Sequence, residues 1–488
     1  MLPHWEVGAV NHENRMTTLD AGFLQAEDSD RHVSLAIGGL ALLAGPVPDQ
    51  SVLRRTLGER MRACPRFSQR IQLHPFDIGP PEWVDDDDFD ITRHVRRIGV
   101  PQPGGDAELH RLVAEVMAWR LDRSRPLWEI WVIEGLSEGR WAMLMKVHHC
   151  IADGIATAHM LAGLADGGAG AAFAERTRAA GPAAATSTVA AAAVDPRSGG
   201  LDPLHWIGGL RGAASAMAAA TVTAVQGASE LAAGLIGAAP TSSLNGPMTN
   251  LRRFGAVRIA LADVRRVCAT FDVTVNDVAL AALAESYRNT LIRHGEQPQH
   301  DSLRTLVPVS VRSLDEFDKT DNRVSVMLPY LPVEEANPVQ RLRMVHARLT
   351  RTKSAGQRQA GSAVVALANR VPYPLTAWTV RLATRLPQRG VVALATNVPG
   401  PRQRLSILGC PVTDVLPVPP IAMQLRTGVA ILSYGDDLYF GILADFDAVP
   451  DIDELARGVQ VAVDRLVAAS KRRKTARHRH GLQLVVNG

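Results

Sequence analysis

A change of composition near the middle of the chain constrains its fold more than any other feature. Twelve of the 30 residues at 171–200 are alanine, and glycine, proline, serine and threonine fill much of the remainder. The sequence on either side mixes strand and helix patterns, so an Ala-rich connector joins two α/β parts. We predict an N-terminal lobe over 1–165, a linker with small-residue helices over 166–245, a C-terminal lobe over 246–470 and a basic tail over 471–488.

Charge and cysteine content narrow the class of protein. The formal net charge is +4, and six cations without any acid lie at 471–479, so the rest of the chain is close to −2. Because nucleic-acid-binding proteins usually carry a basic folded face, we expect no nucleic-acid partner. The four cysteines lie far apart and form no Cys-x-x-Cys pattern. We therefore expect free thiols, a reducing cytoplasmic location and no metal site.

Hydrophobic periodicity predicts the main elements of both lobes. In the N-terminal lobe it predicts helices over Ser51–Cys64 and Asp106–Leu121, and a β-hairpin formed by Glu129–Gly135 and Arg140–His148. In the C-terminal lobe it predicts helices over Val275–His294 and Pro450–Ala468, and strands over Leu303–Val311, Arg323–Leu331, Val391–Thr396 and Gly428–Tyr434.

The strongest local motif is His148-His149-Cys150-Ile151-Ala152-Asp153-Gly154, at the end of the hairpin. Adjacent residues of a strand point to opposite faces, so one histidine should face a cleft and the other should pack. A neutral imidazole is suited to removing a proton from a hydroxyl near neutral pH. Asp153 could orient an imidazole, or it could simply cap a helix over Ile155–Leu164. Cys150 could act as a covalent nucleophile, although a cysteine beside a strand is usually a small buried hydrophobe.

This motif and six others resemble those of a known family. HHCIADG resembles the HHxxxDG motif of CoA-dependent acyltransferases, which chloramphenicol acetyltransferases and condensation domains share. From about Met16 to Ala468 the chain resembles the bacterial wax ester synthase/diacylglycerol acyltransferase family. The other matches, in chain order, are Leu19-Asp20-Ala21-Gly22-Phe23-Leu24, Pro126-Leu127-Trp128-Glu129, Leu244-Asn245-Gly246-Pro247, Asn276-Asp277-Val278, Pro308-Val309-Ser310-Val311-Arg312, Asn397-Val398-Pro399-Gly400-Pro401 and Ser433-Tyr434-Gly435.

The resemblance implies a fold and an activity. It implies an α/β protein with two chloramphenicol-acetyltransferase-like lobes, mixed sheets and an active site at the lobe interface. The activity implied is acyl transfer from acyl-CoA, a substrate, to diacylglycerol or a long-chain alcohol, with no cofactor and no metal. His149 would be the general base, and His148, Asp153 and Gly154 would complete the catalytic motif. Supporting or substrate-binding roles are expected at Pro126, Leu127, Trp128, Asn276, Asp277, Arg312 and Asn397.

Several of these residues also have simpler explanations. Arg312 could pair with a buried Asp153, or it could be a solvated residue at a strand end. Asp277 could close a capping box with Thr274 instead of serving the reaction. Trp128 could line an acyl channel or pack in the core. The Gly154 amide and Asn276 are candidate donors to the oxyanion. The chain has Asp321-Asn322 where the family commonly has Gly-Asn, which affects the local loop geometry.

Lipid substrates require contact with a membrane or a lipid droplet. No stretch of about 20 residues is apolar and uncharged enough to span a bilayer. The helical stretch 205–238 and the basic tail are candidates for reversible attachment to the inner face of the plasma membrane or to droplets. Three alternatives remain open: carrier-protein-dependent or condensation-type transfer, an acyl-enzyme on Cys150, and a lipid-binding paralogue with weak catalysis.

Overall fold

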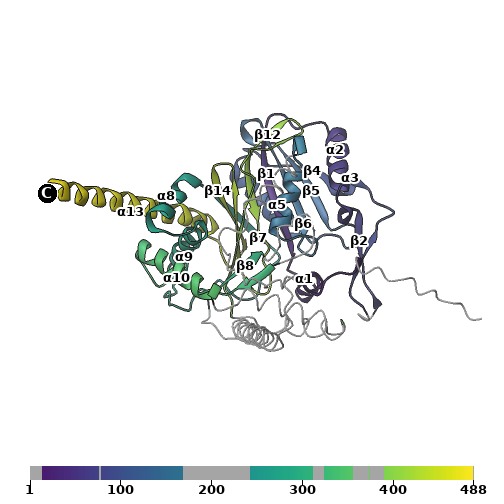
Figure 1. Ribbon diagram of the computed structural model, residues 1–488. Helices are drawn as coiled ribbons and strands as arrows, with labels where there is room; N and C mark the ends of the chain where they lie inside the picture. Colours follow the sequence, from purple (N-terminus) through teal and green to yellow (C-terminus); the bar gives the residue numbers. More distant parts are fainter. Residues whose placement is uncertain are drawn as a thin grey trace, which may run out of the picture.

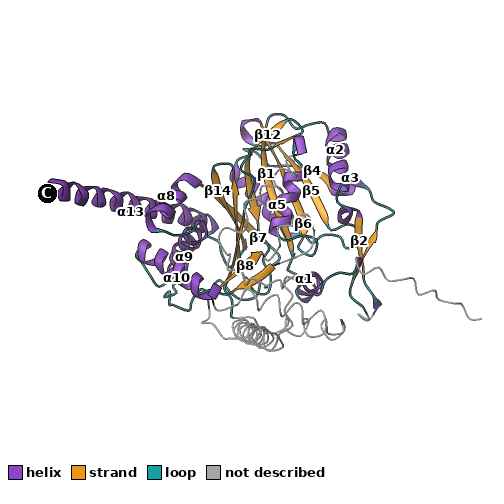
Figure 2. Cartoon of the chain, in the orientation of Figure 1, coloured by secondary structure: helices purple, strands orange, loops and turns teal. Residues whose placement is uncertain are grey.

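The computed structural model describes residues 14–75, 79–168, 242–310, 324–354, 373 and 390–486. The predicted helical stretch 205–238 and Arg312 lie outside these residues, so the proposed pairing of Arg312 with Asp153 stays a prediction. In the described part of the chain the strands form two six-stranded sheets and one two-stranded ribbon. The ribbon pairs β2 (Gln69–Gln72) with β3 (Glu82–Asp85). Figures 1 and 2 show the two large sheets side by side with helices around them.

The first sheet has the order β11-β12-β1-β6-β5-β4. The predicted hairpin appears as the paired strands β5 and β6, and β6 lies at the centre beside β1. All the residues of β6 except the first are buried because the sheet is covered on both faces. The strands are β1 (Ala36–Ala44), β4 (Val95–Gly99), β5 (Trp128–Glu134), β6 (Arg140–His148), β11 (Ser406–Ile407) and β12 (Cys410–Val418). The helices of this half are α1 (Thr18–Ser29), α2 (Gln50–Arg62), α3 (Ile91–His94), α4 (Asp106–Ala118) and α5 (Gly154–Gly163).

The second sheet has the order β7-β14-β13-β10-β8-β9 and is mixed, since β10 is parallel to β8 and β13 while β14 is antiparallel to β13. Its strands are β7 (Arg252–Ala260), β8 (Thr305–Ser310), β9 (Val324–Met327), β10 (Ala393–Val398), β13 (Thr427–Tyr434) and β14 (Asp437–Asp445). Helices α8 (Leu261–Phe271), α9 (Val275–Arg293), α10 (Pro338–Ser354) and α13 (Ile452–Val486) gather on the side away from the first sheet (Figure 1).

The closing helix is longer than predicted. The sequence predicts a helix that ends near Ala468 and a separate basic tail, whereas α13 continues to Val486. Lysine and arginine make up six of the ten residues at 471–480, and both residue types favour a helix. Figure 1 shows α13 leaving the body of the molecule and ending at the C-terminus well away from both sheets.

The predicted lobe boundaries miss an exchange of strands. β11 and β12 belong by sequence to the predicted C-terminal lobe, yet β12 pairs with β1 of the first sheet, with Gly39 opposite Pro417. The chain then crosses through residues 419–426 to β13 in the second sheet. The exchange buries Val412 and Val415 of β12 in the first hydrophobic core. Alternating burial along β12 fits either sheet equally well, so the sequence pattern alone could not assign the strand.

Candidate active site

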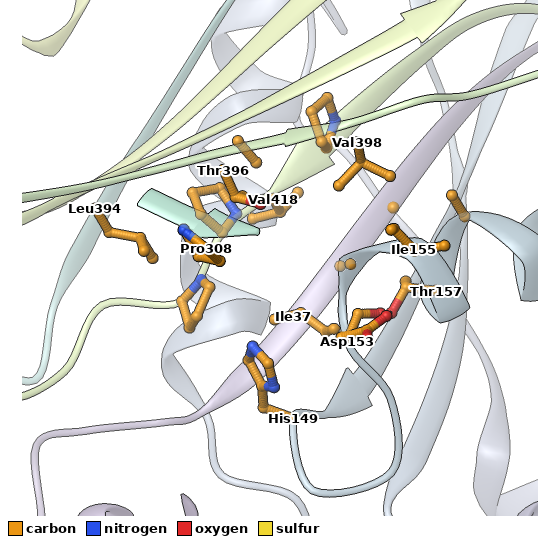
Figure 3. A pocket seen from close by; sticks show the side chains of 18 of the residues that line it. Ile37, His149, Asp153, Ile155, Thr157, Pro308, Leu394, Thr396, Val398 and Val418 are labelled. Atoms are coloured by element: carbon orange, nitrogen blue, oxygen red, sulfur yellow. The ribbon is translucent and has the colours of Figure 1, made fainter. Parts of the chain in front are cut away.

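A cavity of about 340 Å³ lies between the two sheets, and elements of both line it. The first sheet and its helices contribute α1, β1, the turn after β6, α5 and β12, and the second contributes β8, β10, β13 and the crossing segment. Figure 3 shows His149 on one side of the cavity, facing Pro308 and Leu394 of the second sheet. Most of the lining is aliphatic. The side chains that can form hydrogen bonds there are His149, Asp153, Thr157, Thr396 and Asn397.

His149 is held at the end of β6 by contacts on two sides. Its backbone N–H donates to the carbonyl of Leu35 (2.9 Å), which ties the turn to the start of β1. Its imidazole stacks on the ring of Phe23, with centroids 4.1 Å apart and planes 20° from parallel. The side chain is half-buried and lines the cavity. His149 is therefore in a position to contact a bound molecule.

His148 lies on the other side of the strand end and does not line the cavity in the described structure. It is buried, its Nδ1 accepts a hydrogen bond from the backbone N–H of Cys150 (3.1 Å), and its Nε2 lies 3.5 Å from the carboxylate of Glu27. One histidine thus packs and the other lines the cavity, and the catalytic role expected for His148 stays a prediction. Adjacent residues of an extended chain diverge, so His148 supports the turn that carries His149.

Glu27 of α1 is a buried carboxylate with several partners. It also accepts hydrogen bonds from Arg123 (2.7 Å) and from the backbone N–H of Leu35 (3.0 Å). Burial by itself raises the pKa of Glu27. The contacts with His148, Arg123 and Leu35 outweigh burial and lower the pKa to about 2. A carboxylate stabilised in this way anchors α1 to the histidine motif.

Asp153 and Gly154 shape the turn into α5. The Asp153 carboxylate accepts a hydrogen bond from the backbone N–H of Ala156 (2.9 Å), so Asp153 is the N-cap of α5, as the simpler explanation predicted. A Cβ at Gly154 would lie 2.9 Å from Val398 of β10. Glycine at this position therefore lets the start of α5 approach the second sheet. Asp153 and Gly154 both line the cavity.

The Pro126-Leu127-Trp128 segment is part of the core. Leu127 and Trp128 have no exposed surface, and the Trp128 indole donates to the carbonyl of Phe67 (2.9 Å). The Trp128 ring stacks on His94 with centroids 4.5 Å apart. None of the three residues lines the cavity in the described structure. The geometry therefore favours core packing for Trp128 over lining of an acyl channel.

The Asn276-Asp277 pair lies in the first turn of α9, within reach of β10 of the second sheet. Asp277 closes a capping box with Thr274 and pairs with His346 (2.9 Å), so its carboxylate already has partners within the protein. Asn276 accepts a hydrogen bond from the side chain of Asn397 (3.4 Å), and Asn397 lines the cavity. Asn397 is therefore the better candidate for contact with a ligand, and Asn276 supports it.

The segment 244–247 has a role that the sequence reasoning missed. The Asn245 amide donates to the carbonyl of Val391 (2.6 Å), and the Gly246 N–H donates to the carbonyl of Gln424 (3.0 Å). Met423 and Gln424 both have positive φ, a conformation that costs a non-glycine residue about 1 kcal/mol or more and that its surroundings must hold. The segment 244–247 therefore helps to hold residues 419–426, which form one wall of the cavity, in place.

Comparisons with known proteins agree with this geometry. Among solved structures, a wax ester synthase/diacylglycerol acyltransferase from Marinobacter aquaeolei VT8 matches with a TM-score of 0.64 at 24% identity, covering 94% of this chain and 100% of that one. The first condensation domain of the CDA synthetase matches with a TM-score of 0.56 at 14% identity, covering 93% and 96%. These likenesses define the class by fold: an α/β protein with two mixed-sheet lobes, as predicted.

Sequence comparison identifies the family within that class. The wax ester synthase/diacylglycerol acyltransferase catalytic domain matches residues 16–279, and the C-terminal domain of the same family matches residues 320–466. A probable diacylglycerol O-acyltransferase, tgs1 of Mycobacterium tuberculosis, is 58% identical over 97% of this chain and 100% of its own length. The chain belongs to the wax ester synthase/diacylglycerol acyltransferase family, which confirms the predicted resemblance.

The Glu27 contacts predict a specific dependence of stability on pH. Because the folded-state pKa is about 2 and the unfolded value about 4.5, Glu27 stabilises the fold above pH 4.5 and loses that contribution as the pH falls towards 2. The contribution is about 3 kcal/mol. Equilibrium urea unfolding of the wild type and of Glu27→Gln should give a gap in unfolding free energy that is full at pH 6 and shrinks below pH 4.5.

An exposed glutamate on α4 provides the control. Glu115→Gln makes the same substitution at a residue that is exposed to solvent, and it is measured in parallel. A gap for Glu27→Gln that stays constant from pH 6 to pH 3 would contradict the ionic role of Glu27.

Proposed function

We propose that this protein transfers the acyl group of acyl-CoA to the hydroxyl of diacylglycerol, and also to long-chain alcohols, with His149 as the general base. The observation that carries the proposal is a half-buried imidazole in a mainly aliphatic cavity between two sheets. A pocket of about 300–1,000 Å³ with a few converging polar groups is the usual form of a small-molecule site. The family and the names of its mycobacterial relatives support the substrate class.

The reaction needs one base and two bound substrates. The His149 imidazole takes the hydroxyl proton as the acceptor oxygen attacks the thioester carbonyl carbon. The tetrahedral intermediate then collapses, the C–S bond breaks, and the imidazolium returns its proton to the CoA thiolate. The products are an ester and CoA. The Gly154 N–H at the start of α5 and the Asn397 amide both line the cavity and are the candidate donors to the developing oxyanion.

The covalent alternative on Cys150 has little support. The Cys150 side chain is 1% exposed, and burial raises the pKa of its thiol well above the usual range. The thiolate is the nucleophilic form, so a raised pKa opposes acyl-enzyme formation. Cys150 also does not line the cavity in the described structure. Direct transfer between the two substrates is therefore the preferred mechanism.

Replacement of the base tests the mechanism. His149→Ala should lower kcat by about 10²–10⁴-fold, because a positioned base supplies about that much. Radiolabelled acyl-CoA is incubated with diacylglycerol or hexadecanol, and the lipid products are separated by thin-layer chromatography. Circular dichroism verifies that the variant is folded.

The neighbouring cysteine provides the control for that experiment. Cys150→Ala should keep most of the turnover, and no labelled acyl-enzyme should be trapped by acid quenching. A folded His149→Ala variant with wild-type turnover, or an acyl-enzyme that disappears in Cys150→Ala, would overturn the base mechanism.

One end of the cavity is formed where β1 meets α5. Ala36 pairs with His148, and Gly39 lies three residues further along β1, about 10 Å away. Leu161 lies seven residues after Gly154 on α5, also about 10 Å along. A Cβ at Gly39 would lie 3.5 Å from the Leu161 side chain, and both residues line the cavity. We propose that this end receives the distal carbons of the donor acyl chain.

Variants at this end should shift chain-length preference in opposite directions. Gly39→Ala fits beside Leu161 at ordinary contact distance and should favour shorter acyl chains, whereas Leu161→Ala opens the wall and should favour longer ones. An equimolar mixture of dodecanoyl-, hexadecanoyl- and eicosanoyl-CoA is supplied with one diacylglycerol, and the products are analysed by mass spectrometry. Gly99→Ala, where a Cβ would meet nothing within 4 Å, is the control. Parallel shifts in both variants would contradict the proposal.

We also propose that the protein works at a lipid surface, since both acyl acceptors are lipids. The cytoplasmic side is proposed because the widely spaced cysteines fit a reducing compartment. In the described part of the chain no single helix is long and apolar enough to cross a bilayer, and only the bent pair α8–α9 qualifies by length and composition. The end of α13 carries six cations and no acid over 471–479, with Lys471 and Arg472 exposed. Each cation near an anionic surface contributes about 1 kcal/mol, so this segment favours reversible binding.

Vesicle binding tests the basic segment. Replacing all six cations at 471–479 by glutamine should weaken binding to phosphatidylglycerol vesicles at least tenfold and should remove most of its dependence on salt. Binding is measured by co-sedimentation of the full chain. Deletion of 471–488 should have a similar effect. Unchanged binding by the glutamine variant would show that the cations at 471–479 do not attach the protein to the vesicles.

A further inference from the structure

Helix α1 contacts both residues of the histidine pair. Phe23 stacks on His149, and Glu27 pairs with His148. Residues four apart in a helix lie on the same face, so a single face of α1 meets the adjacent histidines at the end of β6. Asp20 strengthens the start of this helix, because its backbone N–H donates to the Thr17 hydroxyl (3.1 Å). The position of the imidazoles therefore depends on α1 as well as on β6.

Phe23 and His149 form a close, nearly parallel ring stack. The centroid distance of 4.1 Å is shorter than that of the other ring pairs in the described structure. Phe23 is half-buried and lines the same cavity as His149, so the stacked faces stand at the edge of the site. In Figure 3 the His149 ring extends into the space between the sheets.

We propose that Phe23 is a positioning residue for the acyl transfer, holding the plane of the His149 imidazole and stabilising the imidazolium formed when it takes the hydroxyl proton. The inference rests on the proposed function of His149. A stacked aromatic neighbour restricts rotation of the imidazole about its Cβ–Cγ bond, which is otherwise a soft torsion. A protonated ring over an aromatic face is attracted to the negative π cloud, and this attraction is absent in the neutral ground state. Both effects act on kcat.

The expected effect is moderate and confined to the chemical step. Stacking and cation–π contacts together correspond to about a 3- to 30-fold change in rate. Phe23→Leu keeps apolar bulk but removes the ring, so kcat should fall by that factor while KM for acyl-CoA and for diacylglycerol stays within about twofold. Phe23→Tyr restores the ring and should recover most of the lost kcat. Phe23→Met serves as the second variant if Phe23→Leu fails to fold.

A second aromatic–histidine stack offers a matched control. Phe89 stacks on His94 with centroids 5.1 Å apart and planes 15° from parallel, and neither residue lines the cavity in the described structure. Phe89→Leu makes the same substitution in the same half of the molecule. If it lowers thermal stability as Phe23→Leu does but leaves kcat unchanged, loss of stability is not the cause of the effect at Phe23.

Three results would overturn the inference: an unchanged kcat in folded Phe23→Leu and Phe23→Met, an equal loss of kcat in Phe23→Tyr and Phe23→Leu, or an equal loss in Phe89→Leu. His149→Ala, assayed in parallel, separates this failure from failure of the proposed function. If His149→Ala is inactive while Phe23→Leu is fully active, the base assignment stands and only the role of Phe23 is wrong. If His149→Ala keeps full activity, the proposed function fails first.

Discussion

The architecture depends on the close packing of β14 against β12, where the two sheets meet. A Cβ at Gly441 would lie 1.6 Å from the carbonyl oxygen of Pro417, so only glycine lets the two backbones come so close. Because β12 itself belongs to the first sheet through its pairing with β1, this contact joins the two halves of the molecule. The chain leaves β12 at once for β13, and the crossing residues close one wall of the cavity. The site exists because the sheets are joined on this side.

The two halves of the molecule also approach each other closely at Gly154, and this contact accounts for the glycine of the histidine motif. Gly154 lets the start of α5 contact Val398 of β10, and Asp153 caps the same helix. His148 is committed to Glu27 and to the backbone of Cys150, which leaves His149 facing the cavity. His148, Asp153 and Gly154 thus shape the turn that carries His149. The His149 imidazole is the proposed base, and the Gly154 N–H remains a candidate donor to the oxyanion.

The sequence predicted the features that depend on neighbouring residues. The β5–β6 hairpin, the N-cap at Asp153 and the capping box at Asp277 follow from local pattern and appear with boundaries close to those expected. The exchange of β12 and the contacts of α1 with the histidine pair join residues more than a hundred positions apart, and no local pattern specifies such partners. The Leu19–Leu24 segment, which includes Phe23, was found by resemblance alone. The role proposed for Phe23 could be inferred only from the stacking of its ring on His149.

The residues around His149, the proposed base, lie apart from those proposed to select the acyl chain. Phe23, Glu27 and the histidine pair lie near the start of β1, while Gly39 and Leu161 lie about 10 Å further along β1 and α5. Substitutions at the distal end change the volume available to a chain without touching the contacts that hold His149. Stability differences between sites this far apart are usually additive. With the proposed roles, the preferred acyl chain could change while the base stays intact, because the two properties would depend on different contacts.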